Sequence, residues 1–575
     1  MKKFLYLMLL LMPLQVLALN IIDNAPITVS TSTVSNIGKN LTYYVRTSGG
    51  DSTQCNGLYD LNYSGVGTAQ NCAFSSPYWA LGAFGGTPIM ASGDTLIIEA
   101  SEFMIGMGAS GATGSGCSES WAYDCYLGAV PSGTSGNPTR ILGANYSNGC
   151  STKSTLWGSK SSQRVLNLAD SDWVEVQCLE LTDKEECGGG KLGTPYTVES
   201  GTACDRNIFP HGDYGQTGLY ATNSDNIYLK DINIHGMAYS GMTTAEISNW
   251  KMVNVDISYN SEAGWKGDVG GVTNNTGYIE WVGGNVDWNG CIESLTTAGT
   301  VKDSSCTGED SGNYSDGIGM DNTGGTWILK DLNVSNNVQD GIDLLYVLNT
   351  GQVIIENLFS SGNGGNNVKV GNTSSQNRIS DSTLIGNCTA MSEENPAMLA
   401  GSATFCRAGG EPIAVTGNTL VERSTVYTSG SAAFLTTERN GETASITFED
   451  SILYIGNRPN IGAQDPNAIE AKAGVGYNSE SGNNLSTWTF NNTIIFDPSI
   501  YVPVFTTFYT NNVLDNSVSN MCELSTSLDP VVTGCADPVF TELPSGDGPT
   551  TWFVMPSLTV DPASPYYNKP IGDYL

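Results

Sequence analysis

A short pattern of alternating apolar and polar residues recurs along the chain at intervals of about 24 residues. Each copy has an apolar-polar strand, then Asn or Asp, then a second short strand, as in residues 227–234 and 327–334. Uninterrupted copies place the central polar residue 23, 26 and 24 residues apart, and longer intervals hold insertions. The central residues are Asp231, Asn254, Asp331, Asn357, Asp381, Asp450 and Asn492.

Repeats of this length, with strands and no helical pattern, indicate a parallel β-helix. One copy cannot bury its apolar face alone, so neighbouring copies must stack at about 4.8 Å to form a continuous core. Asn and Asp at the bends suit left-handed backbone or ladders of side chains. We therefore predict an all-β fold, a right-handed parallel β-helix, over residues 41–500, with an N-terminal cap and loops over about 41–165.

The two ends of the chain differ from the repeat. Lys2 and Lys3 precede an apolar run and a cleavage site with small residues, which is the pattern of a secretory signal peptide over residues 1–18. Residues 19–40 are expected to be a flexible lead, and residues 501–575 a C-terminal cap that covers the last rung. No later apolar run has the length of a membrane span, so we expect a secreted monomer without one.

The composition narrows the choice of partner. The chain has 575 residues, with 57 acidic against 24 basic side chains and a formal net charge of −33. So acidic a surface argues against nucleic acid or anionic membrane as the main partner. Apolar residues make up 39% and aromatic residues 9% of the chain, which is too much for a disordered protein.

The cysteines point to an oxidising compartment. All 14 follow the predicted signal peptide, and their even number favours disulfides in an exported chain. Zinc is the rival explanation, but there are only two histidines and no CxxC motif. Cysteines close in sequence are predicted to staple the loop insertions in pairs: Cys117/Cys125, Cys187/Cys204, Cys291/Cys306, Cys388/Cys406 and Cys522/Cys535.

The repeat also assigns residues to columns that run along the solenoid. Glycines recur just before one of the short strands of each copy, so we expect them to stack on successive rungs. The predicted column is Gly218, Gly241, Gly264, Gly290, Gly317 and Gly341, followed by Asn367.

Acidic residues flank this column. Asp316 and Asp340 precede it on adjacent rungs, about 5 Å apart, and Asp343 follows it with Lys369 on the next rung. Stacked carboxylates repel unless a cation compensates them, and three Asp would suit Ca²⁺, which takes six to eight oxygen ligands. The alternative is that these Asp residues only cap turns and that Lys369 forms a surface ion pair.

At these residues the chain resembles the parallel β-helix polysaccharide lyases, in particular the family 9 pectate lyases. The resemblance covers about residues 214–390 and rests on the segments YSDGIG (314–319), VQDGID (338–343) and GNGGNNVKVG (362–371). It implies that Asp316, Asp340 and Asp343 bind Ca²⁺ and that Lys369 is the base that abstracts a proton. Gln339 stands where the family carries a further Asp, and a distinct β-helix family with a related site stays open.

The predicted function is β-elimination on a uronate-containing polysaccharide, with Ca²⁺ stabilising the charge that develops. Lys266 and Arg378 are predicted to bind substrate carboxylates, and Trp265 and Tyr346 to stack on sugar rings.

Two other functions stay open. One is a glycoside hydrolase with paired carboxylates, for which Asp268, Glu293 and Asp321 are further acidic candidates. The other is a non-catalytic surface β-helix that binds glycan or serves as an adhesin.

Overall fold

The chain divides into the units Met1–Lys39 and Asn40–Leu575. The first unit, with the predicted signal peptide and lead, lies outside the described residues, as does most of 501–575. The computed structural model describes residues 40–118, 122–184, 213–267, 275–291, 294–295, 301–302, 315–320, 322–348, 351–371, 374–387, 411–428, 432–438, 444–455, 474–479, 487–491, 493–497 and 522–525.

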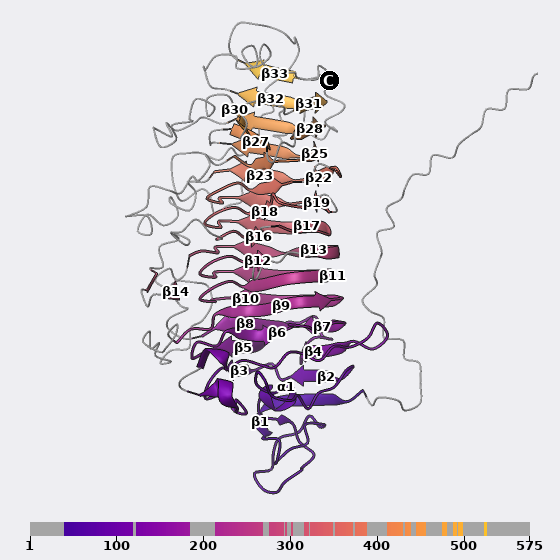
Figure 1. Ribbon diagram of the computed structural model, residues 1–575, viewed down its shortest axis with the longest axis vertical. Coiled ribbons are helices and arrows are strands. Elements are labelled where there is room, and N and C mark those ends of the chain that lie inside the picture. Colours follow the sequence, from indigo (N-terminus) through magenta and orange to yellow (C-terminus); the bar gives the residue numbers. More distant parts are fainter. Residues whose placement is uncertain are drawn as a thin grey trace, which may run out of the picture. The chain divides into compact units, whose positions relative to one another are not determined.

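The second unit is a parallel β-helix in which each rung adds strands to three ladders (Figure 1). The parallel β-helix predicted from the repeat is therefore confirmed. Long strands cross a bend and take part in two or three ladders. The first ladder contains β6 (Arg164–Asn167), β9 (Thr217–Asp225), the start of β11 (Met242–Ser258), β12 (Trp265–Gly267), β16 (Ile318–Gly319), β18 (Ile342–Leu344), β21 (Val368–Val370), β24 (Ile413–Val415), β27 (Ala432–Glu438) and β30 (Gly474–Ser479).

The second ladder contains β1 (Thr42–Gly50), β2 (Thr95–Ile98), β4 (Thr139–Gly143), β7 (Val174–Gln177), β10 (Ile227–His235), β11, β13 (Thr276–Asp287), β17 (Thr326–Ser335), β19 (Gln352–Glu356), β22 (Asn377–Ser380), β25 (Asn418–Glu422), β28 (Ser445–Glu449) and β31 (Thr487–Asn491).

The third ladder contains β3 (Glu102–Ile105), β5 (Ser154–Gly158), β8 (Leu179–Asp183), the ends of β10, β11, β13 and β17, and then β20 (Phe359–Ser361), β23 (Thr383–Gly386), β26 (Thr425–Thr428), β29 (Ile452–Ile455), β32 (Ile494–Asp497) and β33 (Cys522–Ser525). Outside the ladders are α1 (Tyr78–Leu81), two 3₁₀ turns (Ser115–Cys117 and Ala122–Asp124) and the antiparallel pair β14 (Ser294–Leu295) and β15 (Val301–Lys302).

The central polar residue of each copy bends the strand, as the repeat predicts. These residues adopt left-handed backbone, which Asn and Asp tolerate better than other residues with a side chain. In β13 the corresponding residue is Gly283, at φ 73°. The bend residues with φ between 48° and 54° are Asp231, Asn254, Asp331, Asn357, Asp381 and Asp450, whereas Asn492 lies outside the described residues.

The interior is filled by aliphatic side chains and, midway along the β-helix, by four tryptophans. Trp250, Trp265, Trp281 and Trp327 are all at most 1% exposed. The ring of Trp265 lies 5.3–6.4 Å from the other three ring centroids. Such packing of large rings binds several rungs into one core.

A ladder of buried asparagines follows one turn of the β-helix. Asn260 donates from Nδ2 to Asn289 Oδ1 at 2.9 Å, Asn289 to Asn337 at 2.9 Å, and Asn337 to Asn363 at 3.0 Å. Each side chain therefore satisfies its neighbour, which is how a buried amide avoids the cost of desolvation.

Disulfides cross-link the N-terminal part of the second unit. The described residues contain Cys55–Cys72, Cys117–Cys125 and Cys150–Cys178. The sequence predicted the second pairing but neither of the other two. Cys291 is also disulfide-bonded. Cys522 is the first residue of β33, and the other remaining cysteines of the predicted pairs lie outside the described residues.

Disulfides persist in oxidising compartments, so these bonds fit an extracellular protein. Within the part of the chain that the structure describes, no helix has the length and apolar character needed to cross a membrane.

Candidate active site

The first ladder carries the column of residues that the sequence singles out. Lys266 pairs with Gly319, Gly319 with Asp343, and Asp343 with Lys369. Side chains alternate along a strand, so the preceding residue on each of these strands points into the core. Those inward residues are fully buried: Trp265, Ile318, Ile342 and Val368.

The predicted glycine column is correct except at one position. The backbone N–H of Trp265 donates to the carbonyl of Gly317 at 2.8 Å, so Gly264 stacks directly on Gly317. Gly290 instead lies in the turn after β13, with φ 91°. The prediction for Gly290 was wrong because a long insertion after that turn delays the next strand of the first ladder until β16.

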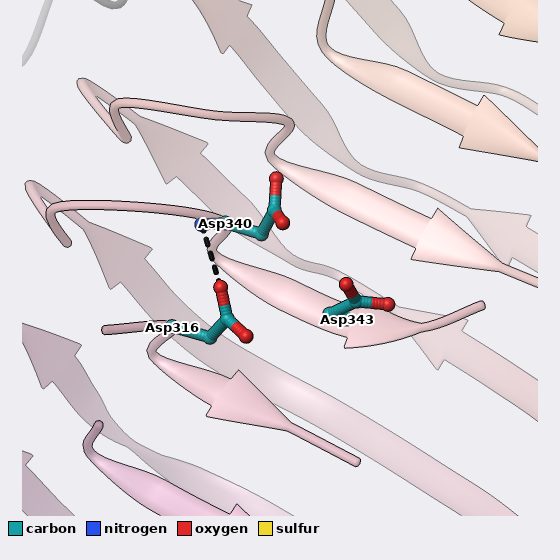
Figure 2. Close-up of side chains that lie close together, drawn as sticks. All are labelled: Asp316, Asp340 and Asp343. Carbon is teal, nitrogen blue, oxygen red and sulfur yellow. Dashed lines mark hydrogen bonds between the residues drawn. The ribbon is translucent and has the colours of Figure 1, made fainter. Parts of the chain in front are cut away.

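Three carboxylates meet beside this column (Figure 2). Asp316 and Asp340 lie just before β16 and β18, and Asp343 lies within β18. One carboxylate oxygen from each lies within 4.8 Å of the other two. Asp316 is 4% and Asp340 6% exposed, so two of the three acids are buried in the wall of the β-helix.

Backbone amides fix one oxygen of each carboxylate. Asp316 Oδ1 accepts from the Asp340 N–H at 2.9 Å, and Asp340 Oδ1 accepts from the Asn366 N–H at 2.6 Å. Asp343 Oδ1 accepts from the Leu345 N–H at 3.0 Å. The second oxygen of each group is therefore oriented without being used by these bonds, and the three groups are held in place by the chain itself.

Lys369 supplies a cation to this cluster. Its Nζ lies 2.5 Å from Asp340 Oδ2 and 3.1 Å from Asp343 Oδ2. The Lys369 side chain is 21% exposed, so it reaches the carboxylates from the outer face. Three carboxylates against one ammonium leave the cluster with an excess of negative charge.

The surroundings shift the pKa values of these groups strongly. Burial raises the pKa of Asp316 well above its usual range, and the charges of Asp340 and Asp343 raise it further. Burial also raises the pKa of Asp343, although Lys369 acts against this. Burial lowers the pKa of Lys369, but the carboxylates of Asp340, Asp343 and Asp316 outweigh it and leave the pKa above its ordinary value.

The donor set fits Ca²⁺. Calcium prefers hard oxygen ligands, accepts irregular geometry and completes its shell with water or substrate oxygens. Asp316, Asp340 and Asp343 offer three anionic oxygens within reach of one ion. Lys369 balances only part of the negative charge of the cluster, and a bound divalent cation would balance the rest.

Two of the other predicted site residues, Lys266 and Tyr346, lie on or just after strands of the first ladder. Lys266 shares the column of Lys369, two rungs from Asp343, and its Nζ lies 3.6 Å from Glu262. Tyr346 is half-buried just after β18, where its carbonyl accepts from the Thr323 N–H at 3.2 Å.

The structure corrects the assignment of Trp265. Its side chain is 0% exposed within the tryptophan cluster, and its Nε1 donates to Thr244 Oγ1 at 2.8 Å. It therefore offers no ring face to a sugar. The alternation of strand side chains carries the reason, because Trp265 directly precedes the outward Lys266.

Arg378 is not brought to the cluster. It lies on β22, in the second ladder, and pairs with Glu422 on the neighbouring β25. A residue in another ladder faces another side of the rung, so Arg378 is not part of the site around Lys369. The acidic candidates Asp268, Glu293 and Asp321 lie outside the described residues.

Asn366 is a site residue that the sequence reasoning did not single out. Its backbone N–H holds Asp340, and its side-chain Nδ2 donates to the carbonyl of Glu411 at 2.6 Å. The signal was present, because Asn366 follows Asp316 and Asp340 in the column that precedes the glycines.

No family model and no curated protein matches the chain. Solved structures with some likeness include pectate lyase Pel9A, at 14% identity and a TM-score of 0.35 over 84% of this chain and 82% of that chain. Another is the A-module of mannuronan C-5 epimerase AlgE6 from Azotobacter vinelandii, at 11% identity and 0.34 over 75% and 91%. A third is a rhamnogalacturonan lyase, at 15% identity and 0.32 over 79% and 87%. Likeness at this level decides no activity.

Proposed function

We propose that this protein is a secreted, calcium-dependent polysaccharide lyase that cleaves a uronate-containing polysaccharide by β-elimination. The observation that carries the proposal is the contact of Lys369 with a trio of carboxylates on the outer face of the first ladder. A cation site beside an amine is the pair of groups that this reaction needs. The disulfides support the secreted location.

The chemistry assigns a role to each group. Ca²⁺ held by Asp316, Asp340 and Asp343 would bind the substrate carboxylate and stabilise the negative charge that develops when the adjacent C5 proton leaves. Lys369, as a neutral amine, takes that proton. The electron pair forms the double bond between C4 and C5, the bond from C4 to the leaving oxygen breaks, and that oxygen takes a proton from water.

A cation held by the neighbouring carboxylates would favour the neutral form of Lys369. The carboxylates of Asp340 and Asp343 raise its pKa, so an ammonium in contact with them is a poor base. Lys266, two rungs along the same outward column, is placed to bind a second carboxylate of an extended substrate. Its positive charge also opposes the repulsion between an acidic protein and an anionic polymer.

The test is an assay for unsaturated uronate by ultraviolet absorbance, on pectate, alginate and related polymers. We expect Ca²⁺-dependent absorbance that a chelator abolishes. Lys369→Ala should lower the rate by about 100-fold or more, because the proton-abstracting group is gone. A matched control is Lys330→Ala, since Lys330 forms a surface ion pair with Glu356 at 2.8 Å on another ladder.

Two results would contradict the proposal. One is the absence of a Ca²⁺-dependent signal on every uronate polymer. The other is the release of reducing ends without absorbance and without an effect of Lys369→Ala, which would favour hydrolysis by paired carboxylates.

A further inference from the structure

A groove lies on the third ladder, apart from the carboxylate cluster. Its volume is about 620 Å³, which is within the range of ligand-binding clefts. It is lined from β8, β10, β11 and β13, with Glu102 of β3 at one end. None of the residues proposed for lyase chemistry lines it.

Two outward columns form the floor of this groove. Glu180 pairs with Asn233, and Asn233 with Asp256. In the other column Thr182 pairs with His235, His235 with Ser258, and Ser258 with Asp287. Strands in a ladder lie about 4.8 Å apart, so the four strands from β8 to β13 present polar side chains over about 14 Å. A flat polar strip of this length matches a few linked sugar units.

Part of the lining is held rigid by internal pairs. His235 lies between Thr182, with Nδ1 3.0 Å from its hydroxyl, and Glu180, with Nε2 2.9 Å from its carboxylate. Lys184 pairs with Glu102 at the end of the groove. Lys184 is thus engaged with a carboxylate, and acidic side chains outnumber basic ones in the lining, so the groove has no excess of positive charge to attract an anionic ligand.

Other polar groups in the lining have capacity left for a ligand. The side-chain oxygen of Asn233 is buried and has no hydrogen-bond partner among the described residues. The carboxyl of half-buried Asp287 lines the groove, and burial followed by the charge of Asp256 raises its pKa to about 7. Near neutral pH this carboxyl can donate as well as accept a hydrogen bond, which suits a hydroxyl ligand.

An aromatic pair borders the same strip. The rings of Tyr259 and Trp288 are stacked, with centroids 6.1 Å apart and planes 8° from parallel. Tyr259 lines the groove. Aromatic rings beside amide, carboxyl and hydroxyl groups provide both an apolar face and directional hydrogen bonds, which are the two features that a sugar ring uses.

We propose that this groove is a binding site for an uncharged oligosaccharide, separate from the carboxylate cluster. Hydroxyl groups pair with both donors and acceptors, whereas a uronate or sulfate would face the carboxylates of Glu180 and Asp256. The site would hold the protein on a neutral glycan whether or not the first site is a lyase.

The test is binding of the full-length protein to an array of immobilised neutral and acidic glycans. Solution titration with the neutral hexasaccharide that gives the strongest signal follows. We expect neutral glycans to bind, and Asn233→Ala and Tyr259→Ala each to weaken the affinity at least tenfold. Asn418→Ala is the matched control, because Asn418 lies on β25 in the second ladder, outside the groove lining. Lys369→Ala should bind as the wild type does.

Three results would overturn the proposal: no neutral glycan binds, only acidic glycans bind, or both groove variants bind like Asn418→Ala. Melting temperatures of all variants separate loss of the site from loss of the fold. Loss of binding in Lys369→Ala alone would assign the glycan to the first site instead. Failure of the lyase assay would leave this result unaffected.

Discussion

At the residue scale, the chemistry of this chain is decided by how each buried carboxylate is compensated. Asp316 and Asp340 are almost fully buried and close together, which is costly for two ionised groups unless cations or protons balance them. Glu180 illustrates the opposite solution. Its hydrogen bond with His235 lowers its pKa to about 2, although burial acts in the other direction. A carboxylate with a dedicated partner is structural, and one without enough partners is a candidate for function.

Asp287 provides a pH-dependent test at this scale. Its pKa is raised from about 3.8 to about 7, so the folded state binds more protons than the unfolded state between these values. The resulting stability is fully present below pH 4 and is lost as the pH rises through 7. Asp287→Asn should therefore be more stable than the wild type at pH 8, by roughly 1–3 kcal/mol, and similar at pH 4. Urea unfolding at both pH values measures this, and equal differences at both would contradict it.

At the scale of the element, the strands are set by two kinds of residue that recur on many of the rungs. Asn and Asp in left-handed backbone turn the chain from the second ladder into the third. Buried asparagines then link the rungs at a different turn. Neither device requires a large side chain, so the rungs can vary in sequence and still stack.

The asparagine ladder gives a prediction about stability. Asn337 donates to Asn363 Oδ1 and to the Val286 carbonyl, and accepts from Asn289. Asn337→Ala leaves these buried groups unpaired and should lower the free energy of unfolding by roughly 1–3 kcal/mol. Asn333→Ala, on the outer side of β17, should cost less than about 0.5 kcal/mol. Denaturant unfolding compares the two, and equal losses would mean that the ladder does not stabilise the rungs.

Most of the stacking of residues on successive rungs was predictable from the sequence. Residues at the same distance along the chain from their bend residues share a column. The same rule predicts the register of Asp343 with Lys369, which the structure confirms. It failed for Gly290, because an insertion breaks the count. It also could have found Asn233, Asp256 and Asn285, each two residues after its bend residue, but the offset does not say which column encloses a groove.

At the scale of the whole molecule, a single β-helix presents different chemistry on different ladders. The first ladder brings together the three carboxylates and Lys369, and the third holds a groove lined by amide, carboxyl and hydroxyl side chains. The acidic composition, with a net charge of −33, therefore does not describe one uniform surface. Part of it is concentrated where a cation would be held. Trp265 points inward because of its place in the alternation along β12, and Arg378 faces another side because β22 joins the second ladder. Neither was visible in residue type alone.

The most direct test of the central claim is a crystal structure of the protein grown with Ca²⁺, with the ion identified by anomalous scattering. We predict one ion bound by Asp316, Asp340 and Asp343, with Lys369 Nζ displaced from its contacts of 2.5 and 3.1 Å with Asp340 and Asp343. Asp340→Asn should bind the ion much more weakly. A cluster that holds no ion at saturating Ca²⁺, with Lys369 still paired to both carboxylates, would contradict the claim.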